Sequence, residues 1–538
     1  MKYFVIGIGG TGMRCIEAFT HLCAMGMCDN MEIDILSIDT DTNNGNKGRS
    51  EQLIERYRRI KGGDGGKPTA NSFFTAKINL FKFAPEYSGN RLTFETISDL
   101  TSGAEDIKRS NKALADLFFD DDVQKFNLNH GYRAQTHMGS HLMYHAIVEA
   151  ARLVREGKGR PEDRSLVEFI NRIFQAGADA RVFILGSIFG GTGASSIPIL
   201  PRALTHALRV SDPNANIQQA QFGCSLLTEY FSFTVPDAVQ TKAQKVIANS
   251  NNFSFNSQAA LMFYEADETV KRTYQRMYHV GWPSSQRKDF SADGKDAKTI
   301  TGGAEQRNPC HVTEFLCAAA ALDFFTRRET ADDKHEIVFR SANEQNGSFL
   351  FDFQDFIGTQ RANDFMNRLG ALYALGLIVI NHEKGGAGQN GVLNLVKKFQ
   401  EFGTPDYVNL PQDDARDIDD YLKAFAFTYE GGEIVPGWLL QVRETVRGSF
   451  LFSADAFSTN YKQLQGVHFG KLFDDESHQF AKKGKLGFGA GDPYNEFCNV
   501  ILKDQTVKPS PEIQKVERLN EHFLAHTYRT LTKLYNLL

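Results

Sequence analysis

The sequence predicts an α/β protein whose core is a parallel sheet, and the reasons are two short apolar runs and a third run rich in isoleucine. Residues 4–6 run into the glycines of 7–12, residues 182–185 run into those of 190–193, and residues 33–38 end at acidic side chains. In the first two cases a helical pattern follows the glycines. Uniformly apolar strands that alternate with helices are typical of parallel sheets covered by helices on both faces.

The overall composition restricts the class of protein. The chain has 538 residues, which is room for about two or three domains, and its hydrophobic content of 41% is ordinary for a globular chain. A net charge of −5 and a pI near 6.3 argue against a broad nucleic-acid surface. We read no membrane span and no secretory leader, and the seven cysteines include no C-x-x-C pair. We therefore expect a cytoplasmic protein that binds neither nucleic acid nor membrane directly.

A glycine-rich turn in the middle of the chain is predicted to bind an anion. Gly190, Gly191 and Gly193 lack a Cβ atom, so their backbone N–H groups can approach a phosphate closely. Thr192 and Ser195 add hydroxyl donors, and the following helix directs the positive end of its dipole to the same place. No lysine follows the glycines, which excludes a Walker P-loop. The alternative is a tight strand-to-helix turn without a ligand.

A second glycine-rich turn stands near the N-terminus and reads Gly7-Ile8-Gly9-Gly10-Thr11-Gly12. By itself this turn fits a nicotinamide site, an adenylation site or a bare turn before a helix. The next predicted strand ends in Asp39-Thr40-Asp41. The carboxyl ends of such strands are where doubly wound sheets bind nucleotides, so we expect Asp39 or Asp41 near the ligand. The alternative for each acid is a solvated strand end.

In their order along the chain, the two turns and the Asp39-Thr40-Asp41 segment resemble the tubulin/FtsZ superfamily of GTP-binding proteins. The G-G-T-G centre of that family's glycine loop is intact at residues 190–193, whereas Phe189 and Ser195 stand where the family has glycines. The resemblance implies that both turns embrace one GTP or GDP, with Mg²⁺ bridging phosphate oxygens. It implies nucleotide contacts from Gly9, Gly10, Thr11, Gly12, Asp39, Asp41, Arg133, Gly139, Gly190, Gly191, Thr192, Gly193, Ala194, Ser195, Glu229 and Asn308.

Four of these residues stand outside the two turns and the acidic strand end. Arg133 and the amides near Gly139 occupy the place of the family's γ-phosphate loop, although Arg133 could instead be an ordinary surface arginine. Glu229 follows a further apolar strand and matches the family's ribose-binding loop, in which Tyr230 replaces a proline. Asn308 matches a guanine-reading asparagine, or else it caps the helix that follows.

The resemblance also divides the chain. Residues 1–307 would form the nucleotide-binding domain, with an insertion at about 43–130 to which we assign no chemistry. Residues 308–328 would form a long, apolar central helix that leads to a second α+β domain at 329–510. Residues 511–538 close the chain with an amphipathic helix, which docks on its own domain or on a neighbouring subunit.

No catalytic residue is identified. In tubulin/FtsZ proteins an acid from the N-x-D-x-x-D loop of the next subunit completes hydrolysis, and we find no such pattern after the predicted central helix. Asp332, Asp333 and Glu336 lie at about the right place without it. His137 and His141 have the i, i+4 spacing of metal ligands, but with no third ligand in the sequence we expect no metal-ligating side chains there.

These patterns favour a tubulin/FtsZ-like GTP-binding protein, a cytoskeletal GTPase that self-assembles head to tail and completes hydrolysis between subunits. One alternative is a tubulin-like scaffold without hydrolysis, acting with partner proteins in bacterial defence or segregation. Another is a Rossmann-type NAD or adenylate enzyme that uses residues 7–12 and Asp39 and leaves the central turn idle.

Overall fold

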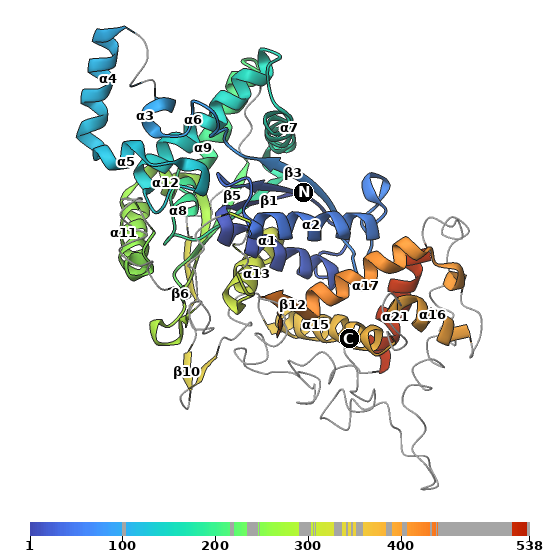
Figure 1. Cartoon of the computed structure of the whole chain (residues 1–538). Helices are drawn as coiled ribbons and strands as arrows, with labels where there is room; N and C mark the ends of the chain where they lie inside the picture. Colours follow the sequence, from blue (N-terminus) through green and yellow to red (C-terminus); the bar gives the residue numbers. More distant parts are fainter. Residues whose placement is uncertain are drawn as a thin grey trace, which may run out of the picture.

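The computed structural model describes residues 1–98, 100, 104–215, 220–233, 246, 248–289, 303, 304, 306, 308–327, 336–340, 343–345, 348–350, 359–382, 390–400, 406–430, 433–436, 438 and 519–534 (Figure 1). Its core, in this part of the chain, is a seven-stranded sheet in the order β3-β2-β1-β4-β5-β7-β9. Every neighbouring pair of strands in it is parallel, which confirms the predicted fold class. The strands are β1 (Lys2–Ile8), β2 (Glu32–Ile38), β3 (Lys77–Phe83), β4 (Ala180–Leu185), β5 (Gln221–Leu227), β7 (Tyr274–Val280) and β9 (Glu336–Arg340).

Helices cover both faces of this sheet, because side chains of a strand point alternately to either side. On β1, Val5 packs in one apolar layer, and Phe4 and Ile6 pack in the other. The layer that holds Val5 contains α1 (Gly9–Ala24), α2 (Gly45–Ile60) and α13 (Val312–Thr326). The opposite layer contains α6 (Thr136–Arg155), α7 (Pro161–Ala176) and α9 (Leu200–Ser211). Burial on both faces explains why strands β1 and β4 are predominantly apolar.

Helix α13 is the predicted central helix, and every residue from Val312 to Phe325 is buried. It packs on α1 and on strands β4, β5 and β7, while Phe315 contacts Phe365 on its other side. Its N-cap is His311, whose ring accepts a hydrogen bond from the Thr313 backbone N–H. The alternative role for Asn308, capping this helix, is therefore wrong.

A second group of helices packs beside α2. It comprises α15 (Thr359–Asn381), α16 (Gly391–Gln400), α17 (Gln412–Ala426), α21 (Leu519–Leu534) and the hairpin β12 (Phe427–Glu430)–β13 (Glu433–Pro436). Arg59 of α2 donates two hydrogen bonds of 2.7 Å to Asp417. On α21, Phe523 and Leu524 are buried, and Asn520 donates to the carbonyl of Ile60. The C-terminal helix α21 therefore packs on other helices of its own chain.

The structure differs from two of the predicted domain limits. The predicted insertion at 43–130 is wrong for α2 and β3, which belong to the central layers. The polar residues in Lys77–Phe83 alternate because β3 lies at the sheet edge and is only half buried. The strand β9 joins the first sheet although it follows residue 329, where the second domain was predicted to begin.

Shorter elements complete the described part of the chain. Helix α4 projects from one end of the molecule beside α3 and α5 (Figure 1). These elements are α3 (Phe94–Ile97), α4 (Glu105–Phe118), α5 (Asp121–Lys125), α8 (Thr192–Ser196), α11 (Phe253–Ala266), α12 (Glu268–Thr273), β6 (Phe231–Ser232), β8 (Lys288–Asp289), β10 (Asn343–Gln345) and β11 (Ser348–Leu350).

Candidate functional site

The two glycine-rich turns meet at the carboxyl edge of the sheet. Strands β1 and β4 are parallel neighbours with Gly7 opposite Leu185, so both turns leave the sheet at the same edge. A Cβ atom on Gly9, which has φ +67°, would lie 3.2 Å from the Thr192 Cβ atom. A Cβ atom on Gly12 would lie 2.6 Å from the Leu185 carbonyl oxygen. The glycines are therefore needed where the turns touch, and the two predicted turns lie against each other.

The first turn of α1 offers backbone donors at this edge. Helix α1 begins at Gly9, its N-cap residue Ile8 supplies no side-chain cap, and no acidic side chain lies in the first turn. The first N–H groups of a helix have no intrahelical acceptor, and they lie at the positive end of its dipole. Gly10 and Thr11 are partly exposed. This end of α1 is suited to an anionic ligand.

Three buried polar atoms beside the turns lack a hydrogen-bond partner within the described residues. They are Asp39 Oδ2, Thr40 Oγ1 and Asn46 Nδ2. Asn46 Nδ2 lies 3.4 Å from the place of a Cβ atom on Gly10, and Thr40 Oγ1 lies 3.5 Å from that of Gly131. An unpaired buried polar atom costs roughly 1–3 kcal/mol, so such a group calls for a ligand or water. The carboxyl end of β2 and the start of α2 are therefore arranged for an additional molecule.

Asp39 is the titratable group of this edge. Burial, and to a smaller extent the nearby Asp41 carboxylate, raise its pKa to about 7. The backbone N–H groups of Asp41 and Thr40 and the ammonium of Lys47 act in the opposite direction. The carboxyl group consequently changes its charge near neutral pH, where a bound cation or hydrogen-bond donor would favour its ionised form.

The loop before α6 closes over the central turn. Arg133 and Ala134 have positive φ values of 45° and 65°. A Cβ atom on Gly191 would lie 2.9 Å from the Ala134 nitrogen and 3.1 Å from that of Arg133. The Arg133 side chain leads away, because Nη1 donates to the carbonyl of Val246 at 2.9 Å. This loop therefore meets the central turn through its backbone.

Other predicted residues of the two loops are used inside the protein. The Gly139 N–H donates to the Gln135 carbonyl within α6. Ser195 Oγ donates to the Thr192 carbonyl at 3.0 Å, and the Ala194 carbonyl accepts from Tyr264 at 2.8 Å. These contacts position the backbone of the central turn.

Asp41 and Asn308 connect the acidic strand end to the segment before α13. The carboxylate of Asp41 accepts from the Gly303 backbone N–H at 2.5 Å and from the Asn43 N–H at 3.1 Å. The Asn308 backbone N–H donates to Asn46 Oδ1 at 2.8 Å, and its carbonyl accepts from Arg49 at 2.7 Å. Asn308 therefore lies next to Asn46, one of the residues with an unpaired atom.

Glu229 lies in a polar cluster on the neighbouring strand end. Its carboxylate accepts hydrogen bonds from Ser254 at 2.8 Å and from Ser257 at 2.6 Å, and it forms an ion pair with Arg287. A hollow of about 400 Å³ beside it is also lined by His279. The Glu229 carboxylate, which was predicted to bind a ribose, thus already has three partners within the protein.

Sequence reasoning missed Thr40, Asn44, Asn46 and Gly131 as parts of the site. Asn44 caps α2 by accepting from the Asn46 and Lys47 N–H groups, and its side-chain amide donates to Gln306 at 2.6 Å. An asparagine followed by a helical pattern is a recognisable cap, but glycines at 45 and 48 made the segment resemble a loop.

Of the acids considered for catalysis, Asp332 and Asp333 lie outside the described residues. Glu336 begins β9, and its side chain is likewise not described. Among the residues that the structure does describe, no group of three His, Cys, Asp or Glu side chains is arranged to hold a metal ion. In the same residues, no helix combines the length and apolar character needed to cross a membrane.

Comparison with known proteins finds similarity among solved structures. A scan against protein families and a search of curated proteins find no match. A search of solved structures matches the chain to "CetZ2 from Haloferax volcanii – GTPgS bound protofilament", with 12% sequence identity and a TM-score of 0.24. The match covers 62% of this chain and 60% of the CetZ2 chain.

Proposed function

We propose that this protein binds GTP between its two glycine-rich turns. The observation that carries the proposal is the contact of Gly9 with Thr192 beside the unpaired atoms of Asp39, Thr40 and Asn46. The N–H groups at the start of α1 and the hydroxyl of Thr192 would bind phosphate oxygens. The choice of guanine rests on the resemblance to the tubulin/FtsZ superfamily, with Asn308 as the residue that would meet the base.

Mg²⁺ fits the oxygen atoms at this edge. Asp39 Oδ2 and Thr40 Oγ1 are hard oxygen donors without a protein partner in the described residues, and Mg²⁺ prefers such donors and retains several waters. When bound, the ion would neutralise part of the phosphate charge. Asp39 and Thr40 would then orient the hydrated ion, and the backbone of Arg133 and Ala134 lies against Gly191 of the central turn.

We further propose head-to-tail self-association with hydrolysis completed between subunits, in the cytoplasm. In the described residues the six cysteines are free and buried, which suits a reducing compartment. An acid from the neighbouring subunit would position the attacking water, and Asp332, Asp333 and Glu336 are the candidates. Phosphate release per molecule should then rise with protein concentration, because the catalytic site needs two subunits.

Calorimetry with GTP tests the binding proposal, using Gly9→Ala and Gly48→Ala as a matched pair. A methyl group on Gly9 would meet Thr192 and would require a strained backbone, whereas Gly48 has no atom within 4 Å of the added Cβ. We expect wild type and Gly48→Ala to bind GTP alike and Gly9→Ala to bind at least roughly tenfold more weakly. Binding of NAD in place of GTP would support the enzyme alternative, and GTP binding with no turnover at any concentration would support the scaffold.

A further inference from the structure

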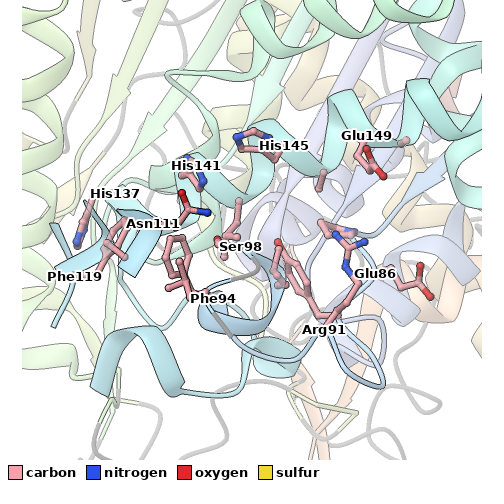
Figure 2. Close-up of a pocket in the computed structure, with 18 of the residues that line it drawn as sticks. Glu86, Arg91, Phe94, Ser98, Asn111, Phe119, His137, His141, His145 and Glu149 are labelled. Carbon is pink, nitrogen blue, oxygen red and sulfur yellow. The ribbon is translucent and has the colours of Figure 1, made fainter. Parts of the chain in front are cut away.

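A second cavity, separate from the glycine-rich turns, opens between α6 and the described residues of 85–98, 100 and 104–119 (Figure 2). Its volume of about 790 Å³ lies within the roughly 300–1,000 Å³ of typical small-molecule sites. None of the described residues that line it belongs to either glycine turn. The cavity is therefore a distinct site.

Its walls are mainly apolar and aromatic. Phe94, Phe119 and Leu142 form part of the lining, together with Leu114 and Phe118 of α4. The last two are 58% and 65% exposed, so α4 presents apolar surface to the mouth of the cavity. Burying exposed apolar surface of this kind contributes roughly 25 cal/mol per Å², which favours a ligand with an aromatic or aliphatic body.

Three imidazoles stand in a row along one side of the cavity. His137, His141 and His145 lie one helical turn apart on α6, opposite Phe94 and Phe119, as Figure 2 shows. The His137 ring stacks on Phe119, with ring centroids 5.0 Å apart. The ring centroids of His141 and His145 lie 4.5 Å apart. Burial and the neighbouring His145 imidazole both lower the pKa of His141. Within the described residues none of these rings has a hydrogen-bond partner, so each offers an N–H donor.

The hydrogen-bond donors around the cavity favour a ligand with an acidic group. Glu149 accepts from Arg152 through bonds of 2.5 and 2.8 Å, although Arg152 also pairs with Glu156, and the buried Asp163 is held by Arg160 at 2.8 Å. Glu86, half exposed at the rim, faces Arg160 at 3.9 Å. Arg91 also lines the cavity and forms no ion pair within the described part of the chain. The lining carboxylates thus face arginines, and the N–H groups left for a ligand are those of one guanidinium and three imidazoles, which can donate hydrogen bonds to an acidic group.

One hydrogen bond links the cavity wall to the loop over the central turn. Tyr87 lines the cavity, and its hydroxyl lies 2.8 Å from that of the buried Tyr132. Tyr132 precedes Arg133 and Ala134, whose backbone nitrogens lie against Gly191. A ligand that displaces Tyr87 would therefore displace the loop that covers the central turn.

We propose that this cavity binds a small amphipathic anion, with an aromatic or aliphatic body and one acidic group. The body fills the space between α4 and α6, and the acidic group meets Arg91 and the imidazoles of α6. Occupancy changes the affinity of the central turn for its nucleotide through Tyr87 and Tyr132, and this second part rests on the proposed GTP binding.

Fluorescence titration with 1-anilinonaphthalene-8-sulfonate, an aromatic anion, and displacement by decanoate test the cavity. Ala146→Phe places a ring in the cavity, Arg91→Gln removes the free guanidinium, and Arg109→Gln changes an arginine of α4 that does not line it. We expect saturable binding that weakens at least roughly tenfold in the first two variants and is unchanged in the third. Equal affinity in all variants, or no saturable binding, overturns the proposal, provided that thermal melting confirms folded protein.

The link to the nucleotide is tested separately with Tyr87→Phe, which removes only the hydroxyl. Decanoate should shift the GTP affinity of the wild type, and this shift should disappear in Tyr87→Phe while decanoate still binds. If GTP fails to bind the wild type, the proposed function fails and the cavity proposal stands. If both ligands bind without affecting each other, the link is refuted and the rest is unaffected.

Discussion

Replacing Asp39 by asparagine should remove a specific pH dependence of stability. The pKa of Asp39 rises from 3.8 to about 7 on folding, mainly because the carboxyl group is buried. The folded protein therefore holds this proton more tightly than the unfolded chain does. The stabilisation is complete below about pH 3.8 and is lost as the pH rises through about 7.

The size of the effect follows from the pKa difference. Each pKa unit corresponds to about 1.4 kcal/mol, so the full difference between acid and alkaline conditions is about 4 kcal/mol. Roughly half of it, about 2 kcal/mol, falls between pH 5.5 and 8.5. Relative to the wild type, nucleotide-free Asp39→Asn should gain about 2 kcal/mol of unfolding free energy over that interval, since asparagine keeps the shape and carries no charge.

Urea denaturation at the two pH values measures this difference. Asp64→Asn is the control, because the Asp64 side chain is 92% exposed and its replacement should change stability by no more than about 0.5 kcal/mol at either pH. If Asp39→Asn and the wild type differ by the same amount at pH 5.5 and at pH 8.5, the carboxyl group is not buried as described.

Three further predictions concern the turns, the metal and the core. Gly191→Ala should weaken GTP binding at least roughly tenfold in calorimetry, because its Cβ would lie 2.9 Å from the Ala134 nitrogen. Gly190→Ala is the control. Its Cβ would have its nearest contact at 3.5 Å, so it should bind GTP nearly as the wild type does. Chelation of Mg²⁺ with EDTA should lower GTP affinity by about tenfold or more, and equal affinity with and without the ion would contradict a role for Asp39. Arg14→Met should lower the unfolding free energy by about 3–5 kcal/mol, measured by urea denaturation. The substitution removes the ion pair of 2.5 Å between Arg14 Nη1 and Glu17 Oε2 and leaves the buried Glu17 carboxylate without its main partner. A loss below about 1 kcal/mol would contradict this prediction.

The sheet could be predicted where the pattern was local and uniform. Strands β1 and β4 have apolar residues in succession and lead into glycines, whereas β2, which includes Asp34 and Ser37, could be recognised by its isoleucines and its acidic end. β3 was missed because an edge strand is half buried, so its sequence mixes Lys77, Asn79 and Lys82 with apolar residues. β9 was assigned to the second domain because no local signal tells a strand which sheet it will join.

The site was predictable only in its backbone. Glycine turns on neighbouring parallel strands had to share an edge, and they do. The directions of side chains depend on distant partners that a single sequence does not reveal. Three contacts show this, each between residues more than 50 positions apart in the chain. Arg133 donates a hydrogen bond to Val246, Glu229 forms an ion pair with Arg287, and Asn46 accepts a hydrogen bond from Asn308.

Identification of the nucleotide that accompanies the purified protein tests the central claim most directly. The protein would be purified without added nucleotide and denatured, and the released small molecules would be separated by chromatography; any emptied protein would then be titrated with GTP, ATP and NAD. The account predicts GTP or GDP at up to one molecule per chain, or selective GTP binding by the emptied protein. Release of an adenine nucleotide, or no affinity for any guanine nucleotide, would contradict it.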